Sequence, residues 1–198
     1  MRYSKEHAEQ TRQRLLKEGA RQVKERGIAG ASVHTIARAV GLSGPAIYSH
    51  FESKGGLLRA LVGEELAATA RRFLDARATF AQALAGYLSL GHVRAPAKGC
   101  ALPAITNDVA RADDGLRDAF QGGFEEIVDA LAEKLDGQRE LSLGVLATSV
   151  GAVALARALP DDARAQELLT AAKRLVEQAL AARGLEVEPA PRAGGEDR

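Results

Sequence analysis

Residues 41–50, "GLSGPAIYSH", place two glycines and a proline within five positions of one another. Just before them, four apolar residues recur at helical spacing: Val33, Ile36, Ala37 and Val40. Gly41 can end that helix, because glycine takes the left-handed backbone conformation at little cost. Ser43 is placed to cap a second helix, and Pro45 falls in its first turn, where a missing N–H costs little. The stretch therefore predicts two short helices joined by a tight turn, a helix-turn-helix.

Composition and the helical spacing of apolar residues predict an all-α protein of about nine helices, among them one over 4–26 that ends at Gly27 and one over 79–93. The chain has 198 residues, of which 46% are hydrophobic and only 4% aromatic, and alanine and leucine dominate. Long runs that alternate β-branched and polar residues are nearly absent, so strands are not expected. The first 14 residues are polar and charged, and the longest apolar run, 141–156, falls short of the roughly 20 residues that cross a bilayer. We therefore expect a cytoplasmic protein with no membrane partner.

Charge is distributed unevenly along the chain. Residues 1–60 hold 11 Lys and Arg against 5 Asp and Glu, a balance of +6, whereas the remainder carries −5. A basic end joined to an acidic body indicates that the basic end meets an anion, although a solvated charged helix gives the same count.

Residues 30–62, "GASVHTIARAVGLSGPAIYSHFESKGGLLRALV", resemble the DNA-binding segment of TetR/AcrR-type transcriptional regulators. The matching features are the turn "IARAVGLS" and the spacing of "IYSHF" to the following "SK" and "LL". The resemblance implies a three-helix DNA-binding domain over 1–53 and a helical ligand-binding and dimerisation domain over 54–184. The polar, Pro- and Gly-containing composition of residues 185–198 predicts a disordered tail. It also implies a sequence-specific regulator, a repressor that leaves its operator when a small molecule binds. "KGGLL" departs from the family, which usually has an acidic residue or alanine there.

The resemblance assigns phosphate contacts to Tyr48, His50 and Lys54. Ser32 and Ser43 are expected to cap helices and to touch phosphate as well. Three residues occupy the family's groove-facing positions but have no side chain for a bidentate hydrogen bond: Gly44, Pro45 and Ala46. Apolar contact with thymine methyl groups and DNA shape would then carry specificity, together with His34, which is either a base or phosphate contact or a plain exposed histidine.

The middle helices present apolar residues that could line a pocket for a small hydrophobic or aromatic ligand, although ordinary core packing explains each of them too. The candidates are Phe73, Tyr87, Leu88, His92, Cys100, Ile105, Phe120 and Phe124.

Residues 141–159 are apolar nearly all round and rich in small side chains, so every side of that helix must be covered. With the helix expected over 162–183 they suit a two-fold four-helix interface, and hence a homodimer on a palindromic operator. A buried core helix in a monomer is the alternative. The predicted interface residues are Leu146, Val150, Val153, Leu168, Leu175 and Val176.

Other functions have less support in the sequence. No nucleophile, base and orienting group stand together, and neither HExxH nor a phosphate loop occurs, so we do not expect an enzyme. His92 and Cys100 lack further ligands at metal-binding spacing, and neither a metal nor a cofactor is expected. A constitutive DNA-binding regulator without ligand remains open. So does a thiol sensor, because Cys100, in "KGCALPAI", resembles a helix start in one branch of the family, where a thiol can sense oxidants or electrophiles. A small buried residue is the plainer interpretation of Cys100.

Overall fold

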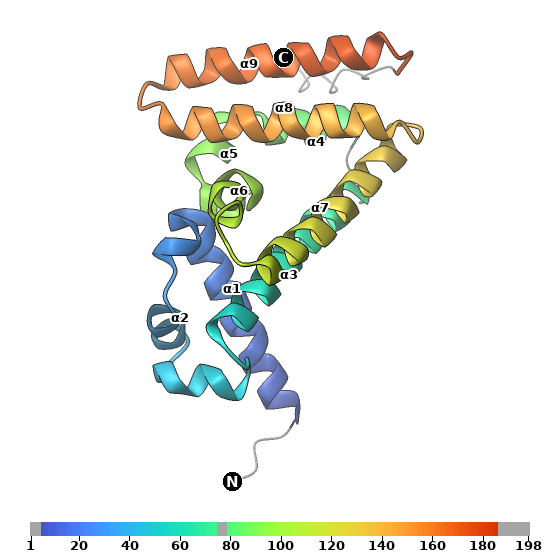
Figure 1. Cartoon of the computed structure of the whole chain (residues 1–198). Helices are drawn as coiled ribbons and strands as arrows, with labels where there is room; N and C mark the ends of the chain where they lie inside the picture. The colour runs from blue at the N-terminus through green and yellow to red at the C-terminus, as the bar shows by residue number, and fades with distance from the viewer. Residues whose placement is uncertain (1–4, 75–78, 186–198) are drawn as a thin grey trace, which may run out of the picture. The chain divides into compact units, whose positions relative to one another are not determined.

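A computed structural model describes residues 5–74 and 79–185, and its regular structure there is entirely helical, as predicted (Figure 1). These residues form nine α-helices and two 3-10 helices. The elements are α1 (Lys5–Gly30), α2 (Val33–Ala39), η1 (Gly44–Ser49), α3 (Lys54–Leu74), α4 (Phe80–Tyr87), α5 (Leu90–Arg94), η2 (Pro96–Lys98), α6 (Leu102–Val109), α7 (Asp114–Lys134), α8 (Arg139–Ala158) and α9 (Asp162–Ala181).

The chain divides into two compact units. The first contains the described residues up to Ala70 together with Ala95–Ile127, and the second contains those of Arg71–Arg94 and from Val128 onward. The predicted domain boundary after residue 53 falls inside the first unit and stays a prediction about function. The predicted tail lies outside the described residues, except for Leu185.

In the first unit, α1 bends where the sequence predicted its end. Gly27 has a φ of 73°, and a further helical turn continues to Gly30. The backbone N–H of Ile28 donates a hydrogen bond of 2.7 Å to Oδ2 of Asp108 on α6. A Cβ on Gly27 would lie 2.7 Å from that same oxygen. Glycine at this position thus permits both the bend and the close approach of α6 to α1.

In the second unit, the helix predicted over 79–93 is interrupted. Thr79 and Gln82 form a reciprocal capping box that begins α4, and Leu88 then leaves the helical conformation with a ψ of 53°. The Ser89 hydroxyl accepts a hydrogen bond from the N–H of His92 at 3.2 Å and so caps α5. The prediction of one continuous helix was wrong because a serine that can cap a new helix competes with helix continuation.

Helices α8 and α9 run side by side in opposite directions in the same unit (Figure 1). The Asp161 side chain caps α9 by accepting from the N–H of Arg164 at 3.0 Å. Arg94 of α5 donates to Asp162 at 2.7 Å and to the carbonyl oxygen of Leu159 at 2.8 Å. By length and composition alone α8 could cross a membrane, but core helices of soluble proteins pass the same test, and α8 packs on both α5 and α9.

Candidate DNA-binding site and ligand cavity

The helix-turn-helix forms as the sequence predicted, from α2, the turn at Gly41 and η1. The Ser32 hydroxyl accepts from the N–H of Thr35 at 3.1 Å and caps α2. Gly41 has a φ of 81°, in the left-handed region that favours glycine. Helix α2 packs against η1, and Ile36 and Ile47 are fully buried at this junction.

The predicted capping role of Ser43 is wrong. Ser43 stands at the start of η1 but its side chain makes no capping hydrogen bond. A capping serine needs an N–H two or three positions into the helix. Pro45 has none, and the N–H of Ala46 is used by the Ser43 carbonyl oxygen at 3.0 Å. The element is a 3-10 helix, and the exposed Ser43 hydroxyl is not used in capping it.

The predicted phosphate contacts lie on or next to η1. Tyr48 is 53% exposed, although it is one of the largest side chains of the chain. His50, at the end of η1, is half-buried, and Lys54, exposed, begins α3. Of the groove-facing candidates, Pro45 is exposed, whereas Gly44 and Ala46 are half-buried. All these residues come from one continuous segment of the first unit.

His34 of α2 lies directly against the start of η1. A Cβ on Gly44 would be 3.3 Å from Nδ1 of His34, tighter than ordinary van der Waals contact. The absence of a side chain at position 44 therefore makes room for the imidazole. The exposed side chain of His34 therefore lies beside Gly44, which has no side chain of its own to contact a base.

Two arginines of α1 hold the helix-turn-helix in place. Arg14 donates to the carbonyl oxygen of Val40, at the C-terminal end of α2, over 3.1 Å. The guanidinium of Arg12 lies 5.1 Å from the centroid of the Phe51 ring, a cation–π arrangement. Part of the basic charge of residues 1–60 thus serves to attach α1 to the two short helices.

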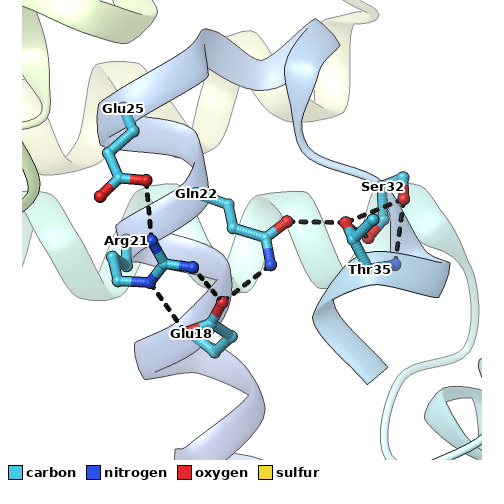
Figure 2. A network of polar contacts seen from close by, with 6 residues as sticks. All are labelled: Glu18, Arg21, Gln22, Glu25, Ser32 and Thr35. Carbon is cyan, nitrogen blue, oxygen red and sulfur yellow. Dashed lines mark hydrogen bonds and ion pairs between the residues drawn. The ribbon is translucent and has the colours of Figure 1, made fainter. Parts of the chain in front are cut away.

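A chain of polar side chains also links α1 to α2 (Figure 2). The Thr35 hydroxyl donates to Oε1 of Gln22 at 2.7 Å, and Nε2 of Gln22 donates to Glu18 at 2.8 Å. Arg21 donates to both carboxylate oxygens of Glu18, at 2.6 and 3.0 Å. This hydrogen bonding from Arg21 is the main cause that lowers the pKa of Glu18, so the carboxylate is ionised and only accepts.

The direction of this chain decides what Ser32 can do. Because Glu18 only accepts, the Gln22 amide must face it with nitrogen and present oxygen to Thr35. The single hydroxyl proton of Thr35 is then directed to Gln22. In the 2.9 Å contact between the two hydroxyls, Ser32 must therefore be the donor. The Ser32 hydroxyl proton is committed inside the protein, and a phosphate contact through it would break this bond.

Gln22 is a functional candidate that the sequence analysis missed. It is buried on α1, about two helical turns after the fully buried Leu15 and on the same face of the helix. The signal was a glutamine at an otherwise apolar spacing, because a buried amide needs hydrogen-bond partners.

The second unit contains a small cavity of about 20 Å³, room for about one water molecule. One wall comes from the end of α3 and from α4: Phe73, Phe80, Ala83, Leu84 and Tyr87. The other comes from α7 and α8: Leu131, Val145, Leu146 and Ser149.

Only part of the predicted pocket is brought together. Phe73 and Tyr87 line the cavity, and His92 contacts Tyr87, whereas Leu88 is buried without lining it. The other four candidates belong to the first unit and do not line this cavity: Cys100, Ile105, Phe120 and Phe124. Ile105 is fully buried core, and the rings of Phe120 and Phe124 stack on each other at 6.2 Å.

His92 is held beside the cavity in a neutral state. Its Nδ1 lies 2.7 Å from the carbonyl oxygen of Tyr87, and the two rings are 4.6 Å apart. Burial is the largest cause that lowers the pKa of His92, and the positive charges of Arg157 and Arg72 lower it further, against the hydrogen bond to Tyr87. A carbonyl oxygen only accepts, so Nδ1 carries the proton.

The predicted interface residues differ in how much surface they offer. Leu146, Val153 and Val176 are buried within their own chain, so these three are not available to a partner. Val150 and Leu168 are half-buried, and Leu175 is 57% exposed. Leu155 of α8, which the sequence analysis did not select, is 61% exposed.

Cys100 is buried in the first unit, just before α6, with 4% of its surface exposed. The Thr69 hydroxyl of α3 lies 4.0 Å from its sulfur. Within the described residues, no group of three or more His, Cys, Asp or Glu side chains is arranged to hold a metal ion.

These features define a helix-turn-helix DNA-binding protein with a second helical unit, and comparison with known proteins agrees. Residues 15–61 match the family model described as bacterial regulatory proteins, tetR family. This match confirms the resemblance to TetR/AcrR-type regulators over the helix-turn-helix segment, and the chain is a DNA-binding transcriptional regulator. A search of curated proteins found no match.

Solved structures share the fold at low sequence identity. A TetR-family regulator from Cytophaga hutchinsonii aligns with a TM-score of 0.72 and 20% identity over 96% of this chain and 100% of its own. One from Agrobacterium tumefaciens gives 0.71 and 19% over 86% and 98%. The reduced form of E. coli NemR gives 0.68 and 19% over 85% and 96%.

Proposed function

We propose that the protein is a cytoplasmic, homodimeric repressor, without enzymatic activity, that a small hydrophobic or aromatic molecule releases from its operator. Residues 1–53 bind DNA, and residues 54–184 bind the ligand and form the dimer. The observation that carries the proposal is the row of exposed polar side chains on and beside η1, Ser43, Tyr48 and Lys54, in a segment that matches the family. These side chains suit phosphate contacts that position the protein on a duplex.

Dimer formation and ligand control have separate support. The exposed leucines Leu155 and Leu175 lie on the paired helices α8 and α9, and a two-fold interface would cover them. Such a dimer reads two half-sites about one helical turn apart, so the operator is palindromic. The almost wholly apolar lining of the small cavity in the second unit supports a ligand-controlled regulator over a constitutive one. Release requires that the ligand bind the DNA-free state more tightly, typically by about 1–3 kcal/mol.

The proposal is tested by selecting genomic fragments that the purified protein retains, and by measuring their affinity at several salt concentrations. Lys54→Ala should weaken binding to every fragment and reduce the slope of log K against log [salt] by about one, because one phosphate contact is lost. Lys134→Ala, the same change in the second unit, is the matched control and should leave the slope unaltered. Failure of the wild-type protein to retain any duplex at low salt would refute the function.

The two serines of the site should behave differently. Ser43→Ala should weaken binding uniformly across sequences by about five- to tenfold, because its hydroxyl is exposed and not used in capping. Ser32→Ala removes the cap of α2 and the donor to Thr35, so it should lower the unfolding midpoint as well. Equal losses of affinity with no change of stability in either variant would contradict these roles.

A thiol sensor is the second candidate. Cys100 lies two residues before the start of α6, whose Asp108 holds the bend of α1, so oxidation of the buried sulfur would disturb the packing of α6 in the first unit. One structural neighbour, E. coli NemR, was solved in a reduced form. With 4% exposure, Cys100 is open to small oxidants rather than to bulky electrophiles, and we rank this mechanism below ligand release.

A further inference from the structure

Helix α2 is attached to α1 near both of its ends. At its C-terminal end, the carbonyl oxygen of Val40 accepts from Arg14 at 3.1 Å. In its first turn, the Thr35 hydroxyl donates to Oε1 of Gln22 at 2.7 Å. Arg14 and Gln22 are about two helical turns apart on α1, so the two bonds together fix the direction of α2 along α1. The buried side chain of Ile36 adds apolar contact, which has no directional preference.

Of these two attachments, the one at Gln22 is the stronger constraint. The Gln22 side chain is only 3% exposed, and both ends of its amide are engaged, since the nitrogen donates to Glu18 at 2.8 Å (Figure 2). A turn of α2 that broke the bond to Thr35 would leave the buried amide oxygen without a partner, which is costly. Arg14 is exposed, so water can replace the acceptor of its bond.

The helix that Gln22 holds carries His34, the residue before Thr35. The imidazole already lies close to the start of η1, because a Cβ on Gly44 would be 3.3 Å from its Nδ1. Gly44 and the two residues after it have no side chain that can form a hydrogen bond with a base. The direction of α2 therefore decides where the histidine side chain meets a base edge.

We propose that Gln22 is a positioning residue for sequence recognition, because its hydrogen bond to Thr35 sets the direction of α2 and so places His34 for base contact. The inference deepens the proposed function and rests on it, since it names the residue of α1 that controls discrimination between sequences. Gln22 does not itself touch DNA. Its loss should lower the preference for the operator and leave the affinity that comes from phosphate contacts unchanged.

Gln22→Leu removes this bond without leaving a buried polar group alone. Glu18 keeps both bonds to Arg21, and the Thr35 hydroxyl has a second acceptor, the carbonyl oxygen of Ser32 at 3.0 Å. The variant should therefore fold.

The affinity of the full-length protein is measured for a selected genomic fragment and for an unrelated duplex of equal length, at several salt concentrations. Gln22→Leu should lower the ratio of the two affinities about five- to tenfold, while the affinity for the unrelated duplex and the salt slope stay unchanged. Gln13→Leu is the matched control on the same helix. Gln13 is exposed and donates to Glu9 within α1, so this change should keep the wild-type ratio.

Gln22→Glu tests the hydrogen bond itself. A protonated carboxyl group can donate to Glu18 and accept from Thr35, as the amide does, whereas an ionised one can only accept. The side chain at position 22 faces the charge of Glu18, with Arg21 and Arg26 on the same helix, whereas α2 presents the Thr35 hydroxyl to it. Burial and the neighbouring carboxylate should raise the pKa of the new carboxyl group, so the ratio should be near the wild-type value at about pH 5.5 and lost at about pH 8. Each ratio is taken relative to the wild type at the same pH, because histidine changes charge in this range.

Several results would overturn the inference. A wild-type ratio in Gln22→Leu, equal losses of affinity for both duplexes, or a ratio in Gln22→Glu that ignores pH would each exclude Gln22 as a positioning residue. If circular dichroism shows that Gln22→Leu does not fold, Thr35→Val removes the same bond from α2, and its ratio decides in the same way. A wild-type protein that retains no duplex refutes the proposed function together with this inference, whereas a wild-type preference that survives these variants refutes the inference alone.

Discussion

Two adjacent glycines of α7, Gly122 and Gly123, should respond differently to the same substitution, and only Gly122→Ala should stabilise the protein. A Cβ on Gly123 would lie 2.5 Å from the Cβ of Leu66 on α3 and 2.9 Å from its Cδ1. Leu66 is fully buried, and no change of its rotamer moves its Cβ. At Gly122, by contrast, an added Cβ meets nothing within 4 Å.

The magnitude follows from two terms. Both positions are helical, so alanine gains about 0.8–1 kcal/mol of helix propensity at each. At Gly123 the forced separation of α3 and α7 adds an overpacking cost of about 1–3 kcal/mol. Gly122→Ala should therefore stabilise the protein by about 1 kcal/mol, and Gly123→Ala should leave it unchanged or destabilise it by up to about 2 kcal/mol. The difference between the two variants isolates the contact, because the propensity term cancels.

The assay is urea unfolding followed by far-UV circular dichroism, with Tm as a second measure at about 2–4 °C per kcal/mol for a chain of this size. DNA affinity is measured on the same samples, because α3 begins at Lys54 and its direction positions that lysine. If Gly123→Ala stabilised the protein as much as Gly122→Ala, the close approach of Leu66 to α7 would be wrong, and so would this account of the glycine pair.

Three further changes test other parts of the molecule. Leu155→Glu should convert the dimer to a monomer in analytical ultracentrifugation and abolish operator binding while the chain stays folded; a dimer that survives would place the interface elsewhere. Cys100→Ser should retain DNA binding, and if oxidant still releases the DNA from this variant, the thiol sensor is excluded. His92 lowers stability in acid, because its pKa is below that of the unfolded chain, where histidine titrates near about 6.5. The unfolding midpoint should therefore fall as the pH drops below about 6.5, and His92→Asn should reduce that loss; an unchanged pH profile would contradict the buried neutral state.

Local chemistry in the sequence predicted the local structure well. The positive φ of Gly41 and the cap at Ser32 both follow from what those residue types can do in a chain, and the structure confirms both. The cap at Ser43 failed because Pro45 removes the N–H that a capping serine would use. The sequence alone would have allowed the correct prediction, because it shows that position 45, two residues after Ser43, is a proline.

The ligand site could not be predicted in the same way. Helical periodicity shows which face of a helix is apolar but not which other helix it meets. Inward-facing residues such as Phe73 and Phe120 therefore have the same pattern in the sequence. In the structure Phe73 lines the cavity, whereas Phe120 belongs to the other compact unit.

The direction of the hydrogen bonds between α1 and α2 also affects which side chains are free to contact DNA. The chain from Ser32 through Thr35 and Gln22 ends at the ionised carboxylate of Glu18, so every proton in it points inward (Figure 2). A hydroxyl that must give up an internal bond to reach phosphate gains little from the exchange, whereas the exposed hydroxyl of Ser43 has no capping bond to give up. The affinity of the helix-turn-helix for phosphate should therefore depend on η1 and the start of α3, and α2 should serve mainly to hold His34 beside Gly44.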